Sequence, residues 1–358
     1  MKNTKVLIGQ LFLLSTLLVM IAIYAWGIAT HFDRPLWADE VHTLRFSSGT
    51  VGDVLDTASS DVHPPLYYLF ANSLQSLFPA LEPILATRLG NAAGVAMILG
   101  GLAYLHRALG TGAATLAALS LLSYGTLAYY TVEARSYFLI LALSWLMTAA
   151  STFGRGRSSE AIVYTTALIL AMTHYFGTAV AIACLAYRAT VALRRGDFGA
   201  VRRATAVAFV IVALFTVWLF QGIESYARIT LFGFWIDTST DTYTAFVRAA
   251  VLPLVCIAAA LAVGGGRVLQ GRGALGHCIF PLLIVLTGTA ILSLIQPIVT
   301  TRNLIVLVPH VCFAAAVLAN PYLTRPIVSA AVAVGALATV PDPGDNFQAY
   351  GDMEWVAR

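Results

Sequence analysis

The stretch VLIGQLFLLSTLLVMIAIYAWGIAT, residues 6–30, contains no charged residue and directly follows Lys2 and Lys5. A bilayer core about 30 Å thick takes roughly 20 apolar residues per helical span. The stretch therefore predicts a first membrane-spanning helix, and it is too long for the apolar core of a typical signal peptide. Similar apolar runs recur almost to Val340, and the whole chain is 59% hydrophobic and 11% charged.

This composition predicts an all-α, polytopic transmembrane protein with about 11 spanning helices. We expect residues 1–358 to form a single domain, since the sequence shows no linker, low-complexity segment or strong internal repeat. The formal net charge of +4 is too small and too dispersed to indicate nucleic-acid binding. The four cysteines lie within apolar runs without paired spacing, which is typical of small core residues.

The segment that follows the first helix, residues 31–85, is expected to lie outside the cell. The positive-inside rule places Lys2 and Lys5 in the cytoplasm, so the first helix delivers the chain to the outer face. Two short polar stretches, Asp39–Ser47 and Val51–Ala58, are expected to form interfacial helices. The apolar run Pro65–Phe78 is too short for a comfortable span and is also expected to lie in the outer interface.

The later spans are then expected to alternate in direction and to end in a short outer tail, residues 341–358. Their expected bounds are Leu85–His106, Ala113–Tyr130, Tyr137–Phe153, Ala161–Thr173, Gly177–Leu193, Thr205–Gln221, Thr244–Val263, Leu275–Ile295, Asn303–Leu318 and Pro326–Val340.

The distribution of charge supports this alternation. It places 13 of the 21 lysines and arginines inside, and only Glu160 and Asp197 of the 17 acidic residues. Treating Pro65–Phe78 as a span would invert every later loop and move the main arginine cluster outside. That cluster comprises Arg188, Arg194, Arg195, Arg202 and Arg203.

Polar side chains gather at the expected outer ends of the helices. A charge at the centre of a spanning helix costs about 2.5 to 3.5 kcal/mol on insertion scales, so each such group needs a reason. One outer cavity lined by carboxylates, imidazoles and guanidinium groups is the simplest arrangement. The candidates are Asp39, Glu40, His63, Arg88, Glu133, Arg135, Tyr137, His174, Tyr175 and Arg302.

Each of these signals also has a plainer interpretation. Asp39 can act as a general base with Glu40 beside it, or it can simply cap a short helix that starts at Glu40. Arg135 suits a bidentate grip on phosphate, or it pairs internally with Glu133. A lone His174 is more often a satisfied core residue than a ligand.

The motifs occur in a recognisable order: a DE pair soon after the first helix, then HPPLYY, TRLGNAAG and EARSY. With its motifs in this order, the chain resembles the type C glycosyltransferases of the dolichyl-phosphate-mannose protein mannosyltransferase and aminoarabinose lipid A transferase superfamily. The likeness is to the bacterial branch that modifies envelope glycans. It covers most of Phe32 to Gly177, whereas the later part matches in helical character and in the TRNLIVLVP segment.

The resemblance implies a role for each matching position. Asp39 matches the catalytic base and Glu40 its partner. The positions implied to bind the phosphate or sugar of the donor are His63, Arg88, Arg135, Tyr137 and Arg302. Glu133, His174 and Tyr175 are candidates for a substrate or metal contact.

The resemblance also implies the reaction and its partners. A sugar would pass from a polyprenyl-phosphate-linked donor to a hydroxyl of an envelope glycan or lipid, at the outer face of the cytoplasmic membrane. No cofactor is certain, and a divalent cation stays open. The chain lacks the large C-terminal domain of the aminoarabinose transferases and the MIR-type insert of the eukaryotic protein mannosyltransferases, which leaves the acceptor open. The main alternative is a transporter or flippase for a lipid-linked sugar.

Overall fold

The computed structural model describes residues 2–32, 34–61, 63–124, 127–222, 246–247, 250–264, 272–294, 300–323 and 325–339. Over these residues the chain is helical, with no strand among them, which confirms the all-α fold class. The elements are α1 Lys2–His31, α2 Ala38–Phe46, α3 Val51–Ala58, α4 Leu66–Leu77, α5 Pro83–Leu89, α6 Asn91–Leu109, α7 Thr111–Leu122, α8 Leu127–Val132, α9 Tyr137–Phe153, α10 Gly156–Thr173, α11 Tyr175–Arg194, α12 Phe198–Gln221, α15 Val251–Gly264, α16 Arg272–Ser293, α17 Thr301–Leu304, η2 Ile305–Leu307, α18 Val308–Ala319, η3 Asn320–Tyr322 and α19 Pro326–Ala338.

Six helical segments in the described part of the chain are long and apolar enough to cross a membrane. Shorter apolar helices of 10–17 residues accompany them at Thr111–Leu122, Tyr137–Phe153, Val251–Ala262 and Pro326–Ala338. These helices are consistent with a multi-pass membrane protein. The six long segments are Leu7–Thr30, Pro83–Leu109, Tyr175–Arg194, Phe198–Gln221, Gly273–Ser293 and Arg302–Tyr322.

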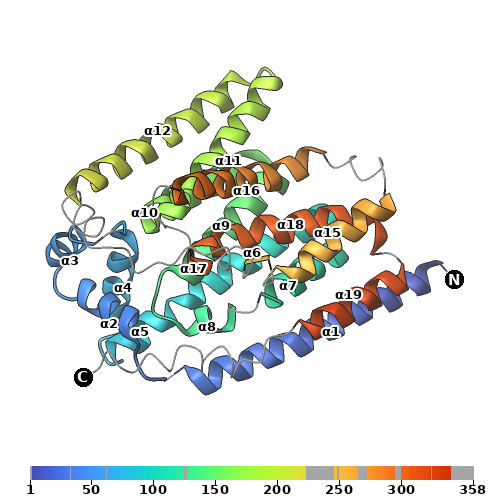
Figure 1. Ribbon diagram of the computed structural model, residues 1–358, viewed down its shortest axis with the longest axis horizontal. Coiled ribbons are helices and arrows are strands. Elements are labelled where there is room, and N and C mark those ends of the chain that lie inside the picture. Colours follow the sequence, from blue (N-terminus) through green and yellow to red (C-terminus); the bar gives the residue numbers. More distant parts are fainter. Residues whose placement is uncertain are drawn as a thin grey trace.

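The centre of the bundle is formed by α9 and α18, which the other helices surround (Figure 1). Almost every residue of both helices is buried, whereas α12 presents large apolar side chains such as Phe209 and Phe220 on its surface. Polar side chains inside the bundle find partners on neighbouring elements. The Ser144 hydroxyl on α9 donates to the Val306 carbonyl at 2.7 Å, and Thr148 lies 3.2 Å from His310 Nε2 on α18.

Small residues allow α6 to approach α9 closely. A Cβ atom added at Gly94 would lie 2.7 Å from the Phe138 ring, and one at Gly101 would overlap the Trp145 ring. The Trp145 indole also donates a hydrogen bond to the Ile98 carbonyl on α6 at 3.1 Å. This is the close helix packing that glycine permits in apolar surroundings, and it holds α9 against α6 along the centre of the molecule.

The segment after α1 forms a cap of short helices, α2 to α5, at one end of the bundle (Figure 1). The expected helices at Asp39–Ser47, Val51–Ala58 and Pro65–Phe78 are confirmed as α2, α3 and α4. Thr50 and Asp53 form a reciprocal capping box that starts α3. Pro83 in the first turn of α5 suits a helix start.

Three expected spans are divided in the structure: Leu85–His106 at Gly90, between α5 and α6, Asn303–Leu318 by the 3-10 turn η2, and Ala113–Tyr130 between α7 and α8. The run Ala113–Tyr130 was expected to be a single helix, but α7 ends at Leu122 and the short α8 begins at Leu127. Ser123 follows α7, and its hydroxyl donates to the Ser120 carbonyl at 2.8 Å instead of continuing the helical pattern. The break allows the segment before α9 to turn at the end of the bundle that carries α2 to α5.

Three consecutive helices connect the two ends of the molecule. α9 and α11 start at the end capped by α2 to α5 and run away from it, and α10 returns between them. At 1.5 Å per residue, their 17, 18 and 20 residues span roughly 25 to 30 Å, about the thickness of a bilayer core. The start of the expected span Thr244–Val263, the Arg267 loop and the tail 341–358 lie outside the described residues.

Candidate active site

Asp39 lies in the first turn of α2 and faces two arginines from distant segments. Its Oδ2 accepts a hydrogen bond from Arg302 Nη1 at 2.7 Å and lies 3.9 Å from Arg135 Nε. The side chain is 27% exposed, so it remains accessible from outside the protein. α2 begins at Ala38, one residue before Asp39, and no side chain caps it. The plainer interpretation of Asp39 as a helix cap is therefore wrong.

Glu40, the next residue, points in a different direction and is completely buried. Arg88 binds it in a bidentate manner, with Nε 3.1 Å from Oε1 and Nη2 2.9 Å from Oε2. The backbone N–H of Ala134 donates to Oε1 at 2.8 Å, and Arg34 Nη2 lies 3.3 Å from Oε2. A buried carboxylate with this many partners is held in one fixed position.

Arg88 is equally occupied. Besides Glu40, its Nη1 donates to the carbonyl groups of Phe32 and Arg34, and its side chain is 1% exposed. The expectation that Arg88 binds the donor phosphate or sugar has no support in this geometry, because its guanidinium group already binds Glu40 and two backbone carbonyl groups. Glu40 is likewise engaged by protein groups and not by the site that Asp39 faces. We assign both residues to positioning the segments around Asp39.

Arg135 and Arg302 bring positive charge to the same place from opposite halves of the chain. The Arg135 side chain is buried and donates to Thr43 Oγ1 at 3.3 Å. Both guanidinium groups lie near the Tyr137 ring, each 5.8 Å from its centroid. The arrangement combines one accessible carboxylate with two guanidinium groups and an aromatic ring, and it suits an anionic ligand with a hydroxyl-bearing portion.

Glu133 is the second carboxyl group of this cluster. Both of its oxygens are buried and have no hydrogen-bond partner among the described residues. Burial raises the pKa of Glu133 to about 8, although Arg302 and Arg135 partly oppose that shift. The carboxyl group is therefore mostly protonated at neutral pH and can donate a hydrogen bond.

The histidines form a second cluster beside the first. Asp61 accepts a short hydrogen bond from the Tyr68 hydroxyl, and its two oxygens lie 3.1 Å from His63 Nδ1 and 3.6 Å from His42 Nε2. Burial raises the pKa of Asp61, but these partners outweigh burial and hold it below the usual carboxyl range.

The rings of His63, His174 and Tyr175 pack against one another in a triangle. The His63 centroid is 5.0 Å from that of His174 and 5.5 Å from that of Tyr175, and the latter two are 4.6 Å apart. His174 Nδ1 accepts a hydrogen bond from the Phe176 N–H, whereas its Nε2 is buried without a partner. Burial lowers the pKa of His174 well below its usual value, so the ring is neutral. The Tyr137 ring, 6.2 Å from His174, connects the histidine cluster with the arginines.

Most of the predicted site residues thus meet at one end of the bundle. The described residues contain no group of three or more His, Cys, Asp or Glu placed to hold a metal ion, and the divalent cation stays a prediction. Sequence reasoning missed Arg34, Thr43 and His42, because a polar residue near a motif gives no sign of which neighbour it will contact.

Comparison of the chain with models of known protein families, with curated proteins and with solved structures gives no match. The site's chemistry is therefore inferred from its own geometry.

Replacing Glu40 with Gln should destabilise the protein strongly. The substitution leaves the Arg88 charge buried without its counter-ion, and breaking a buried pair from one side costs about 3 to 5 kcal/mol. Thermal unfolding in detergent should show a large decrease in the midpoint for Glu40→Gln. The matched control is Glu82→Gln, an exposed position at the start of α5, which should leave the midpoint unchanged. Equal midpoints for the two variants would contradict this role.

The stability of the protein should also depend on the ionisation of Glu133. Its folded-state pKa, about 8, lies above the ordinary value of 4.5, so the folded state retains a proton that the unfolded state has lost. The contribution is present below pH 4.5 and is lost as pH rises towards 8, at up to about 1.4 kcal/mol per pH unit. The unfolding midpoint of wild type should therefore fall relative to Glu133→Gln between pH 5 and 8. Parallel pH profiles would show that Glu133 is ionised when folded.

Proposed function

We propose that this protein is a membrane glycosyltransferase that moves a sugar from a polyprenyl-phosphate donor to an acceptor hydroxyl. The observation that carries the proposal is the convergence of Asp39 with Arg135 and Arg302. Sequence positions 39 and 302 are directly hydrogen-bonded at one end of a bundle of apolar helices. A carboxylate beside two guanidinium groups provides what such a transfer needs: a base for the acceptor and positive charge for the leaving phosphate.

The proposed reaction is a single displacement. The acceptor oxygen attacks the anomeric carbon of the donor sugar while its proton passes to the Asp39 carboxylate. The bond between that carbon and the phosphate oxygen breaks, and its electron pair stays on the lipid phosphate. Arg302 and Arg135 stabilise the resulting negative charge. Attack from the face opposite the phosphate inverts the configuration at the anomeric carbon.

The surrounding residues support this assignment in different ways. Protonated Glu133 can donate a hydrogen bond to a phosphate oxygen or a sugar hydroxyl. The aromatic rings of Tyr137, Tyr175 and His63 provide faces for a sugar ring, and the neutral His174 Nε2 is a buried polar atom in need of a partner. Apolar helix faces around the bundle suit the polyprenyl chain.

We also propose the membrane topology that this reaction requires. About eleven crossings, with the N-terminus in the cytoplasm, place the end capped by α2 to α5 on the outer face of the cytoplasmic membrane. The exposed arginines Arg155, Arg194, Arg195 and Arg202 lie at the opposite ends of α9, α10, α11 and α12, as the positive-inside rule demands.

Two conservative cysteine substitutions test the topology. Ser48 follows α2 and Ser158 lies in the first turn of α10, and both side chains are exposed. A membrane-impermeant maleimide applied to intact cells should label Ser48→Cys, and should label Ser158→Cys only after the membrane is permeabilised. The four native cysteines are buried and serve as the unlabelled background. The opposite pattern would place the proposed site in the cytoplasm and rule out this topology.

Asp39→Asn tests the reaction itself. Asparagine preserves the size of the side chain but cannot accept the acceptor proton, so turnover should fall by roughly 10² to 10⁴. Mass spectrometry of envelope lipids and polysaccharides should show a sugar-sized mass increment in cells with wild type but not with Asp39→Asn. The control, Asp56→Asn, changes an exposed carboxylate on α3 and should retain the increment.

The same experiment can reject the proposal. A folded Asp39→Asn protein that restores the full increment would exclude Asp39 as the base. Accumulation of a lipid-linked sugar across vesicles by the wild type, without any transfer, would instead identify a transporter.

A further inference from the structure

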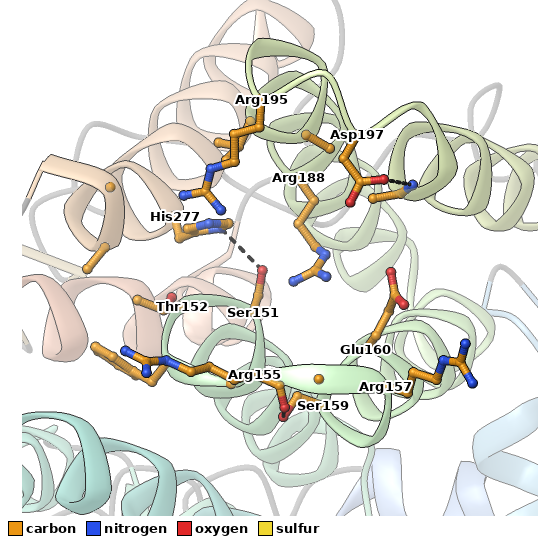
Figure 2. Close-up of a pocket in the computed structure, with 18 of the residues that line it drawn as sticks. Ser151, Thr152, Arg155, Arg157, Ser159, Glu160, Arg188, Arg195, Asp197 and His277 are labelled. Carbon is orange, nitrogen blue, oxygen red and sulfur yellow. Dashed lines mark hydrogen bonds between the residues drawn. The ribbon is translucent and has the colours of Figure 1, made fainter.

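A cavity lies at the end of the bundle opposite Asp39. Its volume is about 770 Å³, and it is bounded by the ends of α9 and α11 and the starts of α10, α12 and α16 (Figure 2). Because α9, α10 and α11 are each roughly one bilayer thickness long, this cavity lies at the other membrane face. None of its lining residues belongs to the proposed transfer site.

The lining is strongly basic. Five arginines and two carboxylates line the cavity: Arg155, Arg157, Arg188, Arg195, Arg203, Glu160 and Asp197. In Figure 2 the guanidinium groups of Arg188 and Arg195 point into the opening, whereas that of Arg157 points away from it.

The carboxylates do not neutralise Arg188 and Arg195. Glu160 is already paired with Arg203 at 3.1 Å and accepts from the Tyr164 hydroxyl at 2.9 Å. Asp197 caps the start of α12 by accepting from the Ala200 N–H at 2.9 Å. Among the described residues, neither Arg188 nor Arg195 has a carboxylate within 4.0 Å. Two guanidinium groups therefore face the cavity without counter-ions.

The backbone adds to this positive field. Gly156, the first residue of α10, lines the cavity, as do Gly273 and Ala274 in the first turn of α16. Helix starts carry partial positive charge and free N–H groups. No side chain caps the start of α10. Beside Arg195 in Figure 2, His277 Nδ1 is 3.2 Å from the Ser151 hydroxyl, so these two side chains supply further hydrogen-bonding groups at the wall.

We propose that this cavity binds a phosphate group, held by Arg188 and Arg195 against the start of α10. Planar guanidinium groups bind phosphate oxygens in a bidentate manner, and an uncapped helix start offers further N–H donors. Mixed lining by arginines and by Phe153, Val191 and Ala192 suits a phosphate that carries an apolar portion. Its source is either the headgroup of an anionic phospholipid in that leaflet or a soluble phosphate.

The test uses the purified full-length protein and two probes. In one arm, the protein is placed in nanodiscs containing phosphatidylglycerol or only phosphatidylcholine, and native mass spectrometry measures the lipid that it retains. In the other arm, calorimetry measures binding of inorganic pyrophosphate in detergent. Arg188→Gln and Arg195→Gln remove the two cavity arginines singly. Arg194→Gln and Arg202→Gln are matched controls, because these exposed arginines lie on the same end but do not line the cavity.

Each cavity variant should weaken binding of at least one probe by about tenfold or more, and each control by less than about twofold. Loss confined to phosphatidylglycerol would identify the lipid as the source, and loss confined to pyrophosphate a soluble phosphate. Arg195 is exposed, so Arg195→Gln gives a decisive result even if Arg188→Gln fails to fold. Wild type that binds neither probe, or controls that lose as much as the cavity variants, would overturn the proposal.

Discussion

The buried ion pair between Glu40 and Arg88 is the interaction on which the rest of this site depends. It joins α2 to the α5–α6 segment, and the Ala134 N–H extends the same contact to the turn before α9. A charged pair away from water is stable only when its geometry and hydrogen bonds are nearly complete. Because Asp39 is the adjacent residue on α2, the direction of its carboxylate follows from the fixed direction of Glu40.

Placing a charged side chain near hydrocarbon costs free energy, and the two ends of the bundle reduce that cost in different ways. At the end capped by α2 to α5, the arginines converge on carboxyl groups, and the buried Glu133 avoids ionisation by retaining its proton. At the opposite end, Glu160 pairs with Arg203 and Asp197 caps the start of α12. Neither carboxylate therefore neutralises Arg188 or Arg195. One end is therefore suited to proton transfer beside phosphate, and the other to holding an anion.

The same three helices link these two regions. α9 leads from Tyr137 at the proposed transfer site to Phe153 at the basic cavity, and α10 and α11 run back and forth between these two regions. The two regions are thus connected by one continuous, buried helix that packs on the glycines of α6. A rigid central helix keeps the separation of the two regions close to the thickness of the bilayer core.

The helical membrane class, the short helices α2, α3 and α4, and the set of polar residues at one end could be predicted from the sequence. Length, hydropathy and helix-start signals are local, so they can be recognised in consecutive residues. Long-range contacts, by contrast, give the neighbours Asp39 and Glu40 different partners, pair Arg88 with Glu40, and bring Arg302 to Asp39. The structure also shows that Arg188, Arg195 and Arg203, three members of the cluster that indicated membrane orientation, line the basic cavity. These outcomes depend on which helix faces meet, and long-range packing of that kind leaves no mark at any single position of the chain.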